Sequence, residues 1–139
     1  TNANILAGCT ASNLSIHAFD KTYEYLKQNL KDVSQLDLGI VNEPEEFTVS
    51  AIPESIRHVY IETTEKVIAQ IKIDSQSIRK LMMIDRLENV LHRLHNQKYK
   101  KQLHLKLQNT ITTQDSKRNL KLIEVDPFLH DWIYNKYTA

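Results

Sequence analysis

Apolar residues recur at intervals of three and four positions between Ile78 and Lys101, and this period constrains the fold more than any other feature of the chain. Such intervals place side chains on one face of an α-helix, at about 100° per residue. The segment is therefore predicted to be an amphipathic helix whose apolar face packs on a core. That face comprises Met83, Ile84, Leu87, Val90, Leu91 and Leu94.

Two earlier segments have the same period. Asn13–Lys31 is predicted to be a helix, with Ser12 or Asn13 able to cap it by accepting a hydrogen bond from a free backbone N–H. Pro53–Lys72 is predicted to be another, because proline fits the first turn of a helix. The apolar faces comprise Ile16, Phe19, Tyr23, Leu26 and Leu30 in the first, and Ile56, Val59, Tyr60, Val67, Ile68 and Ile71 in the second.

A short helix is predicted near the C-terminal end. Asp126 can cap it, and Pro127 takes its first position. Its apolar face comprises Phe128, Leu129, Trp132 and Ile133.

Two regions favour β-strands. Leu36–Val41 and Phe47–Ile52 flank the polar, proline-containing stretch Asn42–Glu46, which indicates a hairpin. Leu103–Leu107 alternates apolar and polar residues, the period of a half-buried strand, and Leu120–Val125 could pair with it. The alternative for this second region is that the helix of residues 78–101 continues through residue 107.

Length and composition indicate one soluble globular domain. The 139 residues are 41% hydrophobic and 25% charged. We expect residues 1–12 to form an N-terminal arm and residues 13–139 a single domain. No apolar run approaches the about 20 residues that cross a bilayer. The predicted fold class is α+β and helix-dominated, with three amphipathic helices, a short C-terminal helix and one or two small β-hairpins.

The lone cysteine and its neighbours bear on location and processing. A single Cys9 excludes an internal disulfide framework and fits the cytoplasm or another reducing compartment. The stretch Leu6–Cys9 has the letters of a lipoprotein box, but only five residues precede it, without the charged and apolar regions of a signal peptide. We therefore expect an ordinary N-terminal arm here.

Glycine is too scarce for the common nucleotide-binding motifs. Only Gly8 and Gly39 are present, so the chain lacks the glycines that let a backbone approach phosphate closely. Nucleophile and base types do occur together, as Cys9 with His17, or as Ser12 with His17 and Asp20. Neither group has glycine support for an oxyanion hole, and such co-occurrence is expected by chance. No catalytic residue and no cofactor is therefore predicted.

Basic side chains line one edge of the helix predicted at residues 78–101. Arg79, Arg86, Arg93 and Lys100 are each seven residues apart, a spacing of about 10.5 Å along a helix. Such a row could bind the phosphates of a nucleic acid through counterion release. It could also dock a protein, or be a solvated flank with surface ion pairs. The formal net charge of +1 gives little long-range attraction for a polyanion, which favours protein docking.

The opposite edge of the same helix carries weak candidates for a metal site. Glu88, His92 and His95 lie four and three residues apart, so their side chains can converge over adjacent turns. Carboxylate and imidazole together suit zinc, iron or manganese. Such a site would need further ligands from a facing helix, for which His58 or Glu62 are the candidates. The pattern has no second half, so no metal is predicted.

Two stretches resemble known families. Arg86 and His92 are similar to the arginine–histidine pair of HEPN ribonucleases, although Leu87 stands where that family usually has a polar residue, and the activity is not carried over. Leu81–His95 resembles the Asp-Arg helix of PhoU-like domains, including those attached to sodium–phosphate cotransporters. That resemblance implies an all-helical regulatory domain linked to phosphate transport.

The sequence thus favours a non-enzymatic protein-binding or regulatory module of a larger protein or assembly, with another protein as its partner. The alternatives are a nucleic-acid-binding domain that uses the basic edge and a PhoU-like regulatory domain.

Overall fold

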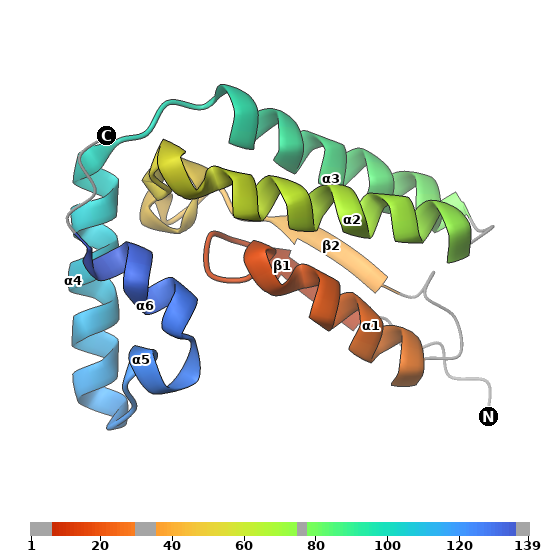
Figure 1. Ribbon diagram of the computed structural model, residues 1–139. Helices are drawn as coiled ribbons and strands as arrows, with labels where there is room; N and C mark the ends of the chain where they lie inside the picture. Colours follow the sequence, from red (N-terminus) through yellow and green to blue (C-terminus); the bar gives the residue numbers. More distant parts are fainter. Residues whose placement is uncertain (1–6, 30–35, 75–77, 136–139) are drawn as a thin grey trace.

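The computed structural model describes residues 7–29, 36–74 and 78–135 (Figure 1). Helices dominate, as the sequence predicts, and a small parallel sheet accompanies them. The strands are β1 (Ala7–Ala11) and β2 (Leu36–Ile40). The α-helices are α1 (Phe19–Asn29), α2 (Arg57–Asp74), α3 (Ile78–Asn96), α4 (Lys101–Arg118), α5 (Leu122–Val125) and α6 (Pro127–Tyr134). Short 3-10 helices are η1 (Ile16–Ala18), η3 (Glu45–Phe47), η4 (Val49–Ala51) and η5 (Glu54–Ile56).

The predicted hairpin at residues 36–52 is wrong, because β2 pairs with β1 and the pairing is parallel. Cys9 lies opposite Leu38 in the register, and the ladder is extended by a hydrogen bond from Val41 N–H to the Ala11 carbonyl at 3.1 Å. Parallel strands need a crossover, and α1 lies in the connection between them. Strand β1 falls within the residues that the sequence assigns to an arm.

The segment after β2 forms 3-10 turns rather than a strand because buried side chains take its carbonyl groups. The Asn13 side-chain amide donates to the carbonyls of Glu46 at 2.8 Å and Thr48 at 2.9 Å. The buried Arg57 guanidinium donates to the Val49 carbonyl at 3.2 Å. These bonds replace the ladder bonds that a strand would require.

Neither Ser12 nor Asn13 caps the helical segment that contains α1, because η1 has Ser15 at its N-cap position, without a side-chain capping hydrogen bond, and Ser12 belongs to the turn before it. The Ser12 hydroxyl accepts from the Leu14 N–H at 3.2 Å, and the Ser12 carbonyl accepts from the Ile16 N–H at 3.0 Å. The Asn13 side chain is buried and directed to η3 and η4. The helical segment therefore begins with η1 and continues as α1, several residues after the start predicted at Asn13.

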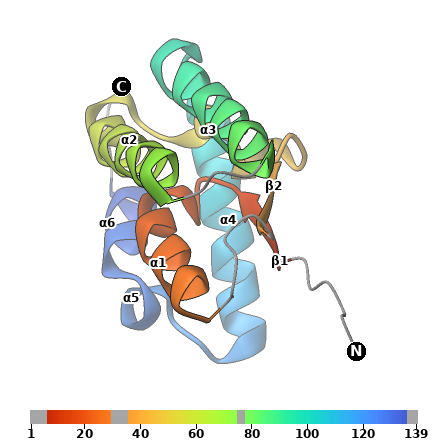
Figure 2. The same ribbon diagram turned by 90° about the vertical axis from the view of Figure 1, so that its right-hand side faces the viewer.

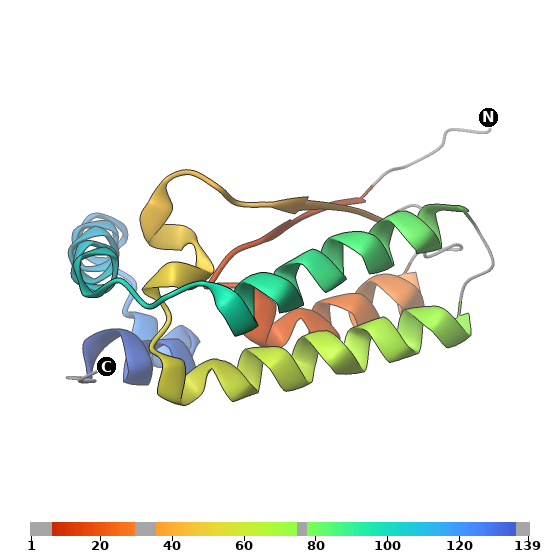
Figure 3. The same ribbon diagram turned by 90° about the horizontal axis from the view of Figure 1, so that it is seen from above.

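The apolar face predicted for the third helix lies in the core. Met83, Leu87 and Leu94 on α3 are buried, and Leu91 is half-buried. Helix α3 packs on both α2 and β2. Helix α2 lies on the side of α1 and α3 that faces away from the sheet (Figures 2 and 3). The sheet thus has helices on the face that carries Leu38, while Thr10 and Gly39 are exposed.

Helix α4 replaces the predicted second hairpin. Leu103 and Leu107 are buried together with Ile111, a spacing of four, while Leu105 between them is 48% exposed. The alternative, continuation of the preceding helix, is also wrong, because α3 ends at Asn96 and a short link precedes α4.

The C-terminal helix agrees with its sequence signal. Asp126 caps α6 by accepting from the Leu129 N–H at 3.1 Å, and Pro127 occupies the first turn. Helices α4 and α6 pack together across one end of the layer formed by α1–α3 (Figure 1). The parallel sheet does not belong to the all-helical fold that the PhoU-like resemblance implies. None of the helices in the described ranges is both long and apolar enough to span a membrane.

Candidate functional site

The arginine edge of α3 is directed largely toward the sheet. The Arg86 guanidinium donates to the Leu38 carbonyl of β2, and Arg93 donates to the side-chain oxygen of Asn42 at 2.9 Å. Both arginines are half-buried. The side chain of Arg79 lies outside the described residues. Lys100 precedes α4, so it belongs to a different element from the arginines.

The candidate metal ligands do not converge. Glu88, His92 and His95 are exposed on α3, and the His92 ring nitrogen Nδ1 contacts the side-chain amide of Asn96 at 3.2 Å. Among the described residues, no group of three histidine, cysteine or carboxylate side chains is placed to hold a metal ion.

The candidate nucleophiles and bases are likewise separated by their own partners. His17 Nε2 lies 2.7 Å from the Asp126 carboxylate, and Asp20 pairs with Lys66 at 3.2 Å. Cys9 is half-buried in β1, and burial raises the pKa of its thiol. The HEPN-like pair is also divided, because Arg86 bonds to β2 while His92 is exposed. The structure therefore assembles none of these catalytic groups.

The charge of the chain is distributed very unevenly, and its basic part is α4 with its flanks. Between residues 98 and 121 the sequence has seven lysines and arginines but one acid, Asp115, which gives a net charge of +6. Because the whole chain has 18 basic and 17 acidic residues, the remainder has 11 and 16, a net charge of −5. A near-neutral total thus conceals one strongly basic element.

Six of these seven cations form two groups at the ends of α4. All six are exposed, and no carboxylate in the described part of the chain forms an ion pair with any of them. The N-terminal basic cluster is Lys98, Lys100 and Lys101, and the C-terminal basic cluster is Lys117, Arg118 and Lys121. The seventh, Lys106, lies 3.6 Å from a carboxylate oxygen of the buried Glu46.

The N-terminal basic cluster is held in place by buried hydrogen bonds beneath the link between α3 and α4. Arg57 donates to the carbonyl groups of Leu94 at 3.2 Å and of Gln97. The Lys100 N–H donates to the Ser50 carbonyl at 2.8 Å. The backbone of the link is therefore fixed, while the lysine side chains that it carries are exposed.

The C-terminal basic cluster surrounds the turn that ends α4. Asn119 takes the left-handed conformation, with φ 54°, that ends many helices and that asparagine tolerates. The Asp115 carboxylate accepts from the Leu122 N–H at 3.0 Å, which ties the turn back to the helix. Asp115, the one acid of this segment, is thereby engaged with the backbone.

Between the two clusters, the outward face of α4 is uncharged and mostly polar. It comprises Gln102, Leu105, Asn109, Thr113 and Ser116, all of them exposed. Figure 3 views α4 along its axis at the edge of the molecule, with α6 and the 3-10 turns on its inner side. This outward face is free of covering elements in the described structure.

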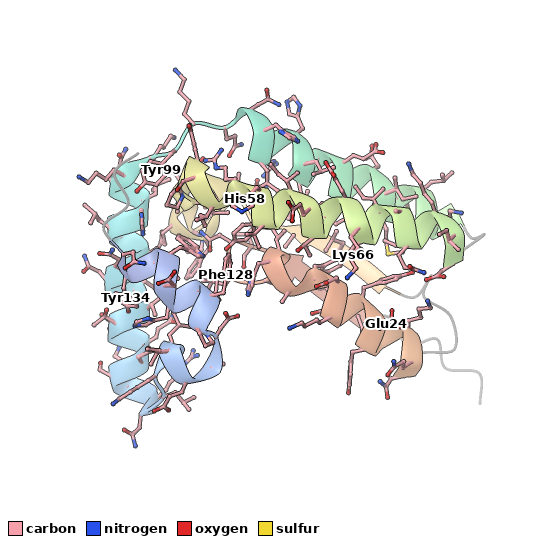
Figure 4. The ribbon with its side chains drawn as sticks, in the orientation of Figure 1. Glu24, His58, Lys66, Tyr99, Phe128 and Tyr134 are labelled. Atoms are coloured by element: carbon pink, nitrogen blue, oxygen red, sulfur yellow. The ribbon has the colours of Figure 1, made fainter. Side chains whose placement is uncertain are left out.

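The inner face of α4 is fixed by a buried histidine. His104 Nε2 lies 2.8 Å from the Ile133 carbonyl, and its Nδ1 lies 2.6 Å from the Tyr99 hydroxyl. A carbonyl can only accept, so Nε2 carries a proton and, in the neutral ring, Nδ1 accepts from the hydroxyl. Tyr99 is thereby held at the start of α4 (Figure 4), and burial raises its pKa.

A shallow groove beside α4 is lined by both acidic and basic side chains. Its volume is about 630 Å³, and its lining includes Glu43, Glu45 and Lys106. A second groove of about 410 Å³ lies between α1 and α2, where Lys66 pairs with Asp20. Both grooves have mixed charge, so neither matches a single class of ionic ligand.

The apolar pattern of the sequence does not indicate the basic surface of α4, because it predicts a strand at residues 103–107 and so divides the basic segment between two elements. A charge count in sliding segments would have found it, because no other part of the chain has seven cations against one acid within 24 residues.

No protein-family model, curated protein or solved structure matches the chain.

Proposed function

We propose that the chain is a nucleic-acid-binding module whose contact surface is the outward face of α4 with its two basic clusters. The observation that carries the proposal is the set of six exposed cations that have no ion-pair partner among the described residues. Lysine and arginine that neutralise phosphates release counterions, and this release supplies most of the non-specific affinity for nucleic acids.

The uncharged middle of the face is compatible with this function. Asparagine, glutamine, serine and threonine side chains donate hydrogen bonds to phosphate and sugar oxygens in many protein–DNA interfaces. Gln102 and Asn109 offer such donors without adding negative charge, whereas the hydroxyl groups of Thr113 and Ser116 donate to the carbonyls of Asn109 at 2.9 Å and Thr113 at 2.8 Å. The side-chain amides of Gln102 and Asn109 could therefore donate to a sugar–phosphate backbone that is held by the basic clusters.

The surface differs from the basic edge considered from the sequence alone. Arg86 and Arg93 bond to groups of β2 and of the loop after it, so these side chains have structural partners. Of that predicted set, Lys100 belongs to the surface proposed here.

A second candidate function, docking of a protein partner within a larger assembly, is favoured by a different observation. Three apolar side chains are exposed next to the C-terminal basic cluster: Leu120 is 54%, Ile123 is 50% and Val125 is 69% exposed. Exposed apolar groups gathered in one place are common at protein interfaces.

The proposal is tested by reversing one charge at each end of α4, in the variant Lys101→Glu/Lys117→Glu. Affinity for a labelled oligonucleotide is measured by fluorescence anisotropy over a salt series. We expect the parent to bind at low salt, and the variant to lower the slope of log affinity against log salt by about two, because two phosphate contacts are lost.

The matched control is Lys21→Glu/Lys72→Glu, which reverses two exposed lysines on α1 and α2 and changes the net charge equally. It should keep the parent's salt slope. An equal decrease of the salt slope in both variants would show that binding depends only on net charge. If the parent does not bind the oligonucleotide at low salt, protein docking is favoured instead.

A further inference from the structure

We infer that the nucleic acid is double-stranded and that α4 lies along it, so that the two basic clusters bind backbone phosphates separated by about the length of this helix, about 27 Å at 1.5 Å per residue. This inference rests on the proposed function and names its ligand class.

The first support is the fixed separation of the clusters. Helix α4 has 18 residues and ends at both sides in a turn held by hydrogen bonds, at Lys100 N–H to Ser50 and at Leu122 N–H to Asp115. A helix of this length is about 27 Å long. The two groups of cations therefore cannot approach each other without breaking these contacts or the helix.

A duplex matches a rigid spacing better than a single strand does. Phosphates along one strand of a duplex repeat at about 3.4 Å, so about eight base pairs cover the distance between the clusters. A single strand is flexible and must be ordered to hold two phosphate groups at that separation, which costs conformational entropy. Two rigid partners lose less entropy on binding.

The second support is that the described residues provide no stacking platform on this face. Proteins that bind single strands usually stack bases on aromatic side chains, at about 1–3 kcal/mol per base. Among the described residues around α4, Tyr99 and Tyr134 (Figure 4) are half-buried and hydrogen-bonded through their hydroxyl groups, to His104 and Thr112. Trp132 is buried. Within the described residues, the outward face of α4 and the two basic clusters therefore offer cations, polar groups and the apolar Leu105, but no exposed ring.

This geometry predicts that the protein contacts the sugar–phosphate backbone of the duplex and does not recognise its base sequence. The contacts available at the clusters are to phosphates, which carry no base identity. We expect the protein to bind duplexes of different base sequence with similar affinity. We also expect the affinity to depend on duplex length, which contact at one cluster alone would not cause.

The test measures affinity against duplex length, with duplexes of about 6, 8, 10 and 16 base pairs, corrected for the number of overlapping sites. For the parent, affinity should rise at least tenfold between the shortest duplex and those that reach both clusters, and then level off. A single strand of the longest length should bind at least tenfold more weakly than the corresponding duplex.

Two variants separate the ends of α4. Lys98→Gln/Lys100→Gln/Lys101→Gln neutralises one cluster, and Lys117→Gln/Arg118→Gln/Lys121→Gln neutralises the other. Each should abolish the length threshold and reduce the salt slope by about three, because three phosphate contacts are lost. Circular dichroism of each variant checks that α4 remains folded.

The outcomes distinguish this inference from the proposed function. Equal affinity for single strands and duplexes, or a length threshold that survives in either cluster variant, would overturn the inference while nucleic-acid binding stands. No binding to any oligonucleotide at low salt would remove both.

Discussion

At the scale of single residues, the buried cation Arg57 connects main-chain groups that are distant in sequence. Its guanidinium donates to the carbonyls of Val49, Ile52, Leu94 and Gln97. Burial lowers the pKa of Arg57, although the negative charge of Glu54 opposes this effect. The side chain still keeps its charge near neutral pH, because arginine titrates far above that range. One residue thus joins η4 to the end of α3.

Replacing Arg57 with methionine should lower the free energy of unfolding by about 2–4 kcal/mol, because methionine keeps an apolar side chain but leaves buried carbonyls without a donor. Urea denaturation followed by circular dichroism measures the change. His58→Gln, in the same turn of α2 and exposed, should change it by less than about 0.5 kcal/mol. Equal stability of the two variants would contradict the structural role assigned to Arg57.

At the scale of elements, the sequence was sufficient where an apolar period ran through several turns. Helix α3 has its predicted face in the core, and α6 has its predicted cap. The segment Leu103–Leu107 is too short to distinguish a strand from a helix, since leucines at alternate positions also include the four-residue interval of a helix. His104 is buried and Leu105 is exposed, which is the pattern of the helix and not of the strand, and His104 bonds to the Ile133 carbonyl of α6, which is distant in sequence.

Local sequence patterns do not predict the sheet either, because its two strands are distant in sequence. Strand β2 pairs with β1, about thirty residues earlier, whereas hairpin signals concern neighbouring strands. The carbonyl groups of η3 and η4 are taken by the side chains of Asn13 and Arg57. A polar side chain that bonds to a distant main-chain group leaves no periodic signal in the sequence.

Asp74 links α1 to α2 through polar contacts whose strength depends on its charge and therefore on pH. Asp74 accepts hydrogen bonds from the Tyr23 hydroxyl at 3.2 Å and the Gln70 amide at 3.0 Å, and pairs with Lys27 at 2.8 Å. Burial raises the pKa of Asp74, but the hydrogen bonds from Lys27, Gln70 and Tyr23 outweigh this and lower the pKa below its ordinary value of 3.8.

Because the pKa of Asp74 is lower in the folded state, the unfolded state binds more protons in acid. The stabilisation is present above about pH 4 and is lost as the pH falls through the folded-state pKa. Asp74→Asn should therefore be less stable at neutral pH and lose less stability on acidification, as measured by urea denaturation from about pH 7 to pH 2. Asp85→Asn, exposed on α3, should keep the parent's profile. A profile for Asp74→Asn that parallels the parent's would contradict this role of Asp74.

At the scale of the whole molecule, the distribution of charge matters more than its sum. A formal net charge of +1 suggested little attraction for a polyanion, but the segment from residue 98 to 121 carries +6 and the rest carries −5. Both values come from the sequence alone. The structure shows that the six cations outside the Glu46–Lys106 pair share one exposed helix and its flanks. The sequence pattern does not show this, because it divides them between a helix edge and a hairpin.

This separation of charge predicts a long-range effect that can be distinguished from direct contact. Glu24 on α1, in a part of the molecule remote from α4 (Figure 4), and Asp85 on α3 are exposed and form no ion pair within the described residues. Their charges oppose the approach of a nucleic acid to α4. The variant Glu24→Gln/Asp85→Asn should therefore associate faster, by about twofold, at an ionic strength of about 0.01 M, where the screening length is about 30 Å.

At about 0.15 M the screening length falls to about 8 Å, and the variant should associate at the parent's rate. Stopped-flow fluorescence with a labelled duplex measures both rates. Lys101→Glu is the matched comparison, because a residue in contact with phosphate should slow association at low salt and also speed dissociation at both ionic strengths. If the acid variant changes dissociation, or keeps its advantage at the higher ionic strength, then Glu24 or Asp85 touches the nucleic acid. The contact surface would then extend beyond α4 onto the acidic part of the molecule.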